Sequence, residues 1–514
     1  MAPGVPGRLV GVQTAVFLEG VCAVTSVVSS GMVVLVIAAV GLAAVLSNRL
    51  SERLHIPTPA IFLLCAAVAS DLVPSLGRLR IETVDQVVTV ALAVILFDGG
   101  LHIGWRRFRP AALATVWLGV AGTLLTAGAV ALCAHLLFGL DWRLSLLLGT
   151  ALAPTDPAVV FSVLSRREVA GRSGILLQGE SGANDPVGIA LMVALLATGG
   201  SGGRAVGAVV LQFGLQMVVG VVVGVIGGRL LLRLMRRLPL PSEGLYPLRV
   251  LAGALAIYGV ASVARGSGFL AVFVAGILIG DERAPYKREI ERFHSALASL
   301  AEIVAFLLLG LTIHLADLPD GSAWLIGLVL AVLLVLVIRP LLVGLLLWPV
   351  RLRWGERLFV LWTGLKGAVP ILLGVFVLEA GLAGAQRLYH VIFVVVAFSV
   401  VVQGTLVPLL AQRLRVPLHT VEPEPWSLGV RFRREPDAVH RHRVAPGSPA
   451  DGVTISELPC QEDVWVSLVI RDGHLVPVSA DTRLRAGDEV LVLADPEHAG
   501  DLGSLFRPAR TGRG

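Results

Sequence analysis

Residues 149–161 read GTALAPTDPAVVF and place Asp156 inside an otherwise apolar segment, between Pro154 and Pro157. A proline removes a backbone donor and clashes with the preceding helical turn, so a helix is expected to unwind here. Unwound backbone at membrane depth is tolerated only where it lines protein or water, and its freed carbonyls can coordinate a cation. The stretch therefore predicts an interrupted transmembrane helix that presents Asp156 and the Thr155 carbonyl. The alternative is a plain proline kink with an incidental aspartate.

A second stretch has the same character. Residues 362–374 read WTGLKGAVPILLG, where Gly364, Gly367 and Pro370 interrupt an apolar run that also holds Lys366. The two stretches occupy matching positions in the two halves of the chain, which is typical of inverted-repeat transporters whose site lies between two broken helices. No internal sequence identity supports the repeat.

Polar residues cluster in the segment that follows the first stretch. Residues 176–191 read LLQGESGANDPVGIAL and contain Glu180, Ser181, Asn184 and Asp185. Residues four apart share a helix face, so Ser181 lies beside Asp185 and Glu180 beside Asn184. Carboxylate, hydroxyl and amide oxygens are hard ligands that suit an alkali cation. A serine-hydrolase elbow is excluded because Ala183 replaces its second glycine.

The composition is that of a membrane protein. The 514 residues are 55% hydrophobic and 15% charged, against about 25% charged in a typical soluble domain. We predict an all-α polytopic protein with about 13 transmembrane helices, two of them broken and crossing. The apolar runs lie at roughly 31–49, 57–74, 84–103, 111–138, 143–164, 176–199, 205–235, 247–264, 267–281, 295–316, 322–349, 356–379 and 386–414.

The charges of the loops predict the orientation. One set of alternate loops carries 19 Lys and Arg residues and the other set carries 6. The positive-inside rule places the richer set in the cytoplasm, with the N-terminus outside and the C-terminal tail inside a cell (inner) membrane. The net charge of +6 then reflects the basic residues that orient the protein in the membrane, and no nucleic-acid partner is expected.

The two ends of the chain differ from the apolar middle. Residues 1–30 form a moderately apolar extension and a poor signal peptide, because Arg8 is the only basic residue before Arg49. We expect a transmembrane domain at 31–415, a proline-containing linker at 416–430 and a small α/β cytoplasmic domain at 431–514. In that last part residues 464–470 alternate as a strand, 471–473 suggest a hairpin turn, and 488–493 predict another strand.

Other charges lie within apolar runs. A charged side chain at the bilayer centre costs at least about 2.5–3.5 kcal/mol on insertion scales, so such residues are candidates for function. They are Asp98, Glu302 and Arg339. Glu302 either lines the site or pairs with a basic residue at a helix end.

Four motifs together resemble a known family. APTDPA, GESGANDP, FDGGL and GLKGAVP resemble the cation:proton antiporter-1 family, and more narrowly its potassium/proton antiporters of cell-volume-regulation type, over residues 31–415. Residues 471–493, RDGHLVPVSADTRLRAGDEVLVL, resemble the C-terminal regulatory RCK-C (TrkA-C) domain of potassium-transport proteins.

The resemblance implies a role for each matching residue. Asp185 would bind cation and proton in turn, and the alkali cation would also be held by Asp156, Ser181 and the Thr155 carbonyl. Asn184 before Asp185 is the form associated with electroneutral exchange. Glu180 and Asn184 would pair with the basic residue at 366, where this chain has lysine instead of the family's usual arginine. Asp98 would lie on an access path, and Arg339 would be structural.

The expected function is therefore exchange of a monovalent cation, with K⁺ favoured, for protons across the membrane, regulated by the tail. A Na⁺/H⁺ antiporter of the same fold is the main alternative, followed by a cation channel or symporter and by an intramembrane enzyme. No phosphate-binding loop or dinucleotide fingerprint occurs, so neither ATP-driven pumping nor a cofactor is expected. An intramembrane enzyme would need a His or metal cluster, which the sequence does not show, so no enzymatic activity is expected. The resemblance also implies a homodimer and a small nucleotide such as cyclic di-AMP on the tail.

Overall fold

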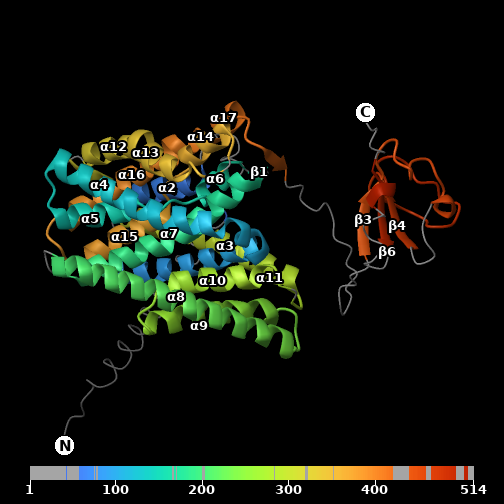
Figure 1. Cartoon of the computed structure of the whole chain (residues 1–514), viewed down its shortest axis with the longest axis horizontal. Coiled ribbons are helices and arrows are strands. Elements are labelled where there is room, and N and C mark those ends of the chain that lie inside the picture. The colour runs from blue at the N-terminus through green and yellow to red at the C-terminus, as the bar shows by residue number, and fades with distance from the viewer. Residues whose placement is uncertain are drawn as a thin grey trace, which may run out of the picture. The chain divides into compact units, whose positions relative to one another are not determined.

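The computed structural model describes Leu42 and residues 57–73, 76, 79–164, 167–169, 171–198, 203–282, 284–318, 322–350, 352–420, 439–458, 465–493 and 503–507. The chain forms two compact units, Met1–Pro423 and Glu424–Gly514. The first is a bundle of helices and the second carries a small sheet (Figure 1). The expected extension 1–30 and, apart from Leu42, the expected first span 31–49 lie outside the described residues.

Apolar helices make up the first unit. Among the described residues, seven helical segments are long and apolar enough to cross a membrane. Every predicted run from 57–74 onward corresponds to a helix or to an interrupted helix, which confirms the polytopic fold. The uninterrupted helices are α2 (Thr58–Leu72), α7 (Gly171–Ala197), α8 (Gly203–Arg237), α9 (Leu245–Val263), α10 (Gly268–Gly280) and α11 (Lys287–Leu311).

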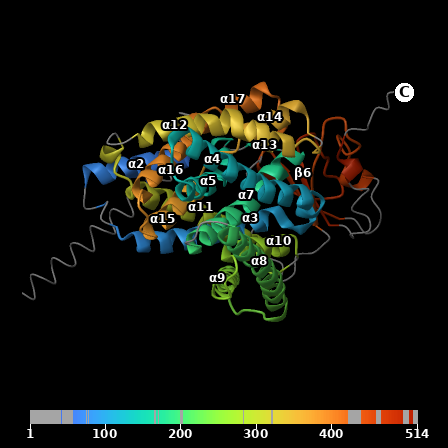
Figure 2. The same ribbon diagram turned by 60° about the vertical axis from the view of Figure 1, so that its left-hand side comes forward.

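Helices α8 and α9 lie side by side at one edge of the bundle (Figure 2). Much of α8 is apolar and exposed, including Val210, Leu211 and Val218. In a bilayer such side chains contact lipid, so the exposure is what a membrane-facing helix requires.

A sharp kink joins the third predicted span to the start of the fourth. Helix α3 (Ile81–Trp117) contains Gly104, whose φ of 64° and ψ of 160° interrupt the helical geometry. The side chain of Asp281 accepts a hydrogen bond from the backbone amide of Arg106 just beyond the kink. A positive φ at this position favours glycine, so Gly104 sets the point where the chain turns into the next span.

Both predicted breaks are present. The first separates α5 (Trp142–Leu152) from α6 (Ala158–Leu164), and the second separates α14 (Trp354–Trp362) from α15 (Ala368–Glu379). The backbone amide of Asp156 donates a hydrogen bond to the carbonyl of Leu365, over 2.8 Å. The two unwound stretches therefore meet and satisfy part of each other's backbone, as buried irregular backbone must.

In the part of the chain that the structure describes, three π-helical turns mark further irregularities. The first, η1 (Leu118–Gly122), joins α3 to α4 (Thr123–Phe138). The second, η3 (Leu334–Ile338), joins α12 (Ala323–Leu333) to α13 (Arg339–Leu346). The third, η4 (Ser399–Gln403), lies between α16 (Ala385–Phe398) and α17 (Val407–Arg413). The first two lie in the fourth and eleventh spans, which directly precede the two broken spans. Both halves thus share a π-turn span followed by a broken span, as expected for a repeat.

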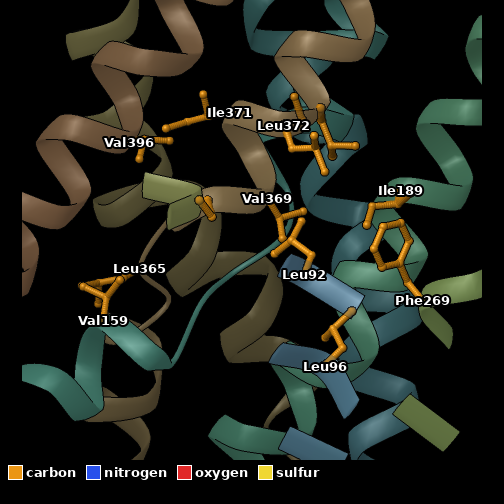
Figure 3. Packing of buried hydrophobic residues seen from close by; sticks show 14 of the residues in the cluster. Leu92, Leu96, Val159, Ile189, Phe269, Leu365, Val369, Ile371, Leu372 and Val396 are labelled. Carbon is orange, nitrogen blue, oxygen red and sulfur yellow. The ribbon is translucent and has the colours of Figure 1, made fainter. Parts of the chain in front are cut away.

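Apolar side chains from several spans pack around the crossing. Figure 3 shows Leu92 of α3 close to Val369 of α15, with Ile189 of α7 and Phe269 of α10 nearby. All four are buried. The polar groups at the breaks are therefore embedded in a packed apolar shell.

A short ladder lies at the end of the first unit. Strand β1 (Arg167–Val169) pairs antiparallel with β2 (Leu418–Thr420). The stretch expected to be a linker, 416–430, therefore begins with a segment that belongs to the first unit.

The second unit contains a four-stranded antiparallel sheet in the order β3-β6-β4-β5. Its strands are β3 (Val439–Arg443), β4 (Trp465–Arg471), β5 (His474–Val476) and β6 (Glu489–Leu493). Of these, β4 and β6 lie close to the two predicted strands, 464–470 and 488–493. Asp472 and Gly473 have φ of 48° and 78°, which makes the predicted hairpin turn between β4 and β5. The small core includes Val469, Val490 and Phe506.

The packing of α3 against α10 gives a test of the bundle. A Cβ added at Gly100 would collide with the carbonyl of Phe273 and the amide of Ile277, whereas one added at Gly99 would meet nothing within 4 Å. Gly100→Ala should lower the thermal midpoint of the purified protein, because overpacking costs about 1–3 kcal/mol. Gly99→Ala is the matched control and should leave the midpoint unchanged or raised. Equal midpoints for the two variants would contradict this packing.

Candidate functional site

The first break meets α7 at a group of buried oxygen atoms. Thr155 lies in the break, and Ser181, Asn184 and Asp185 lie on α7; all four are buried. A Cβ at Gly188 would collide with the ring of Pro154, so this glycine allows α7 to approach the break closely. The structure thus brings together the residues that the sequence placed in two separate segments.

One hydrogen bond joins the two segments directly. The side-chain amide of Asn184 donates to the hydroxyl of Thr155 over 2.7 Å. Asn184 Oδ1 and Asp185 Oδ1 are buried and have no hydrogen-bond partner among the described residues. Buried polar atoms without a partner are costly, so they indicate a place where a ligand or proton binds.

Charges surround Asp185. Both Asp156 and Lys366 lie close enough to interact electrostatically with its carboxylate. The backbone of the second break packs closely against Asp156, because a Cβ at Gly367 would collide with the Asp156 carboxylate. The buried Asp185 and Lys366 and the half-buried Asp156 therefore lie near one another, and a cation or a proton there can balance the excess negative charge.

Lys366 connects the second break to the first. Its Nζ donates hydrogen bonds to the carbonyls of Ala153 at 3.0 Å and Pro154 at 2.9 Å, and the side chain is almost fully buried. Its backbone amide donates to Ser399 Oγ at 2.9 Å, and Ser399 Oγ donates to Gln403 Oε1 at 2.8 Å. The ammonium lies just beyond the C-terminus of α5, where a positive charge is favourable.

The salt bridge of Glu180 differs from the one predicted. Arg339 Nη2 donates to Glu180 Oε1 at 2.9 Å, and both side chains are buried. Arg339 Nε also donates to the carbonyl of Leu361 at 2.9 Å, near the end of α14. The expected pairing of Glu180 and Asn184 with Lys366 is therefore wrong. Glu180 forms its salt bridge with Arg339, and Asn184 forms its hydrogen bond with Thr155.

The physical reason is the shape of the two cations. Guanidinium is a planar fork that serves a carboxylate and a helix end together, whereas an ammonium is a compact point charge. A Cβ at Gly364 would collide with the Arg339 guanidinium, so this glycine makes room for the fork. Lysine at 366 reaches the carbonyls of the first break instead.

Comparisons with known proteins agree with this geometry. The model of the transmembrane domain of sodium/hydrogen exchangers matches residues 20–413, and that of the TrkA-C domain matches residues 439–507. The chain belongs to the sodium/hydrogen exchanger family. The resemblance seen in the sequence is thereby confirmed, including its combination with a TrkA-C domain.

Individual relatives give the same picture. The chain is 34% identical to "K(+)/H(+) antiporter NhaP2" of Shewanella sp. (strain MR-4) over 91% of this chain and 82% of the relative. It is 26% identical to "Na(+)/H(+) antiporter ApNhaP" of Aphanothece halophytica over 71% and 72%. Its fold is similar to that of the sodium proton antiporter MjNhaP1 from Methanocaldococcus jannaschii, with a TM-score of 0.63, 23% identity, and coverage of 74% of this chain and 99% of that one.

In this exchanger, two predicted residues lie on other helices than the buried group of Thr155, Ser181, Asn184 and Asp185. Asp98 of α3 faces Ser295 and His102 between α3 and α11, and Glu302 lies further along α11. Sequence reasoning missed Ser399 and Gln403, which hold the backbone at Lys366. Their signal was present, because both are polar residues in the apolar run 386–414.

No group of three or more His, Cys, Asp or Glu side chains in the described part of the chain could hold a metal ion. An alkali cation needs no such group, because carbonyl, hydroxyl and amide oxygens also serve it. Such a cation is the transported substrate of an exchanger and not a resident metal.

The assignment of the salt bridge can be tested by a double-mutant cycle. Arg339→Met should lower the free energy of unfolding by about 3–5 kcal/mol, because it leaves Glu180 buried without its cation. Adding Glu180→Met should recover much of that loss. The control pair, Lys366→Met with Glu180→Met, should be closer to additive. Thermal or denaturant unfolding of the purified proteins measures both cycles. Strong coupling of Glu180 to Lys366 and none to Arg339 would contradict the structure.

Proposed function

We propose that the chain exchanges a monovalent cation for protons by competition at Asp185, and that it acts as a transporter rather than an enzyme. The observation that carries this proposal is the Asp185 carboxylate, which is buried beside a broken helix with one oxygen lacking any hydrogen-bond partner among the described residues. Either a proton or a cation completes the bonding of that oxygen. Neither binds well when the other is present.

The residues around Asp185 have distinct roles in this proposal. Asp156, Ser181 and the Thr155 carbonyl complete the oxygen ligands of the cation. Asn184 holds Thr155, and so fixes the first break against α7. Lys366 and the Glu180–Arg339 pair hold the unwound segments in place. One bundle of helices then moves relative to the other, so that the loaded site opens to each side in turn.

The cation is proposed to be K⁺, and the exchange to be electroneutral. The relatives named K(+)/H(+) antiporters support K⁺, as does the TrkA-C domain. The relative named a Na(+)/H(+) antiporter keeps Na⁺ as the second candidate, since the same oxygen ligands serve both ions. The order Asn184-Asp185 supports electroneutral exchange. A channel would instead show flux uncoupled from protons.

The remaining proposals concern the membrane, the orientation, the oligomeric state and the regulation of the exchanger. The excess of Lys and Arg in alternate loops supports a cell (inner) membrane protein with its N-terminus outside and its tail in the cytoplasm. We further propose a homodimer. The TrkA-C domain supports regulation by a small cytoplasmic ligand, with a nucleotide as the working candidate.

Asp185→Asn should abolish exchange while the protein remains folded, because a neutral amide can neither release a proton nor balance a cation. Asp156→Asn should do nearly the same. The measurement is proton movement in liposomes containing the purified protein, driven by K⁺ or Na⁺ gradients under a clamped membrane potential.

Glu243→Gln, at a connection between helices α8 and α9, is the control and should exchange normally. Normal exchange by Asp185→Asn would contradict competition at one carboxylate. A wild-type rate that changes with membrane potential would contradict electroneutrality, and a higher rate with Na⁺ would contradict the choice of K⁺.

Removing the tail should leave exchange intact and alter its activation. The cut belongs after Pro423, because an earlier cut after Arg415 would also remove β2 and its ladder with β1. Exchange by the two truncated proteins should be compared with that of the full chain over a range of pH and K⁺. A stable protein cut after Pro423 that has lost all exchange would contradict a regulatory tail.

A further inference from the structure

A polar stripe runs along one face of α11. Glu291, Ser295 and Glu302 are separated by four and seven residues, which places them within about 40° of each other around the helix. Glu302 is about 16 Å further along the helix axis than Glu291. The stripe thus connects the end of α11 that carries the basic residues Lys287 and Arg288 with the middle of the bundle.

Helix α3 adds polar groups beside the start of this stripe. Ser295 Oγ donates to Asp98 Oδ1 at 3.4 Å and lies 3.4 Å from His102 Nε2. His102 Nδ1 lies 3.4 Å from Asp98 Oδ2. The His102 side chain is 51% exposed and that of Asp98 is 15% exposed, so this cluster is open at the end nearest the basic loop. A cation arriving from that end meets Asp98 together with its partner His102.

Glu302 lies at the inner end of the stripe, and among the described residues no side chain forms a salt bridge with it. Its Oε1 is buried and has no hydrogen-bond partner in the described part of the chain. The alternative that Glu302 pairs with a basic residue at a helix end is therefore not observed. Helix α11 also packs against α15, which begins at the second break, and this places Glu302 where its carboxylate interacts electrostatically with Asp156.

Glu302 and Asp156 belong to different parts of the bundle. Helix α11 packs mainly against α2 and α3, and also against α9 and α15, whereas Asp156 lies in the break between α5 and α6. If the broken helices move relative to α11 during exchange, the separation of the two carboxylates changes with the direction in which the site opens. Glu302 then attracts a cation in one state more than in the other.

We propose that Glu302 recruits the cation for the site at Asp185 and Asp156, receiving it from the Asp98–Ser295 end of α11. Glu302 is not the carboxylate at which cation and proton compete; it raises the apparent affinity for cations that enter from the side of the basic loops. This inference rests on the proposed function and names the route to its site. Removing the charge leaves the competing groups intact.

The test compares Glu302→Gln with Glu302→Asp and with Glu289→Gln in the full-length protein. Glu289 lies on the same helix and is exposed, two residues from Glu291 and so on the opposite face. K⁺/H⁺ exchange is measured in everted and in right-side-out membrane vesicles, which present opposite sides to the added K⁺. Half-saturating K⁺ and maximal rate are determined separately.

Glu302→Gln should raise half-saturating K⁺ about tenfold when K⁺ is added on the side of the basic loops, which corresponds to about 1.4 kcal/mol. The maximal rate should stay within about twofold of wild type, and Glu302→Asp should restore most of the affinity. Glu289→Gln should match wild type. A half-saturating K⁺ for Glu302→Gln that equals wild type, or an equal rise on both sides, would overturn the proposal.

A second measurement tests the route without Glu302→Gln, and it decides the question if that variant is not produced in stable form. Ser295→Cys is treated with a positively charged thiol reagent from the side of the basic loops. The reaction should inhibit exchange, and K⁺ should slow it; no reaction at Ser295→Cys would overturn the route. Failure of the proposed function is distinguishable, because the wild-type protein itself would then show no K⁺/H⁺ exchange.

Discussion

The rest of this structure depends on one constraint: the backbone amides and carbonyls must find hydrogen-bond partners where the two unwound helices cross. Inside an apolar bundle each freed amide and carbonyl needs a partner. The Asp156 amide bonds the Leu365 carbonyl, the Lys366 ammonium bonds the carbonyls of Ala153 and Pro154, and Arg339 bonds the end of α14. These contacts fix Asp156 opposite α7. Among the described residues, Asn184 Oδ1 and Asp185 Oδ1 lie at this crossing without a hydrogen-bond partner, and a transported ion or proton can use them.

The glycines near the crossing serve this constraint. A side chain at Gly364 would displace the guanidinium of Arg339, one at Gly367 would displace the Asp156 carboxylate, and one at Gly188 would push α7 from Pro154. Small residues that allow close approach are a general device of helix packing in membranes. Here they place Arg339, Asp156 and the first break within reach of α7. The same shell of packed apolar residues keeps water from replacing these contacts (Figure 3).

The sequence predicted the broken helices well and the partners of the buried charges poorly. Prolines and glycines act on their own segment, so Pro154, Pro157 and Gly367 indicated both breaks without knowledge of the fold. The partner of Glu180 depends on how three spans cross, which local patterns do not contain. For the same reason the sequence did not reveal that Leu418–Thr420 pairs with Arg167–Val169. The positions of Asp98 and Glu302 on facing helices likewise became visible only in three dimensions.

The account makes Asp185 the common acceptor of cation and proton, and equilibrium cation binding as a function of pH tests this claim most directly. Binding of radioactive Rb⁺ or of K⁺ to the purified full-length protein is measured from alkaline to acid pH. Competition for one carboxylate predicts that the apparent affinity falls about tenfold for each unit of pH once the proton binds, with about one proton released for each cation bound. A cation affinity that stays constant through the range in which exchange itself responds to pH would contradict the account.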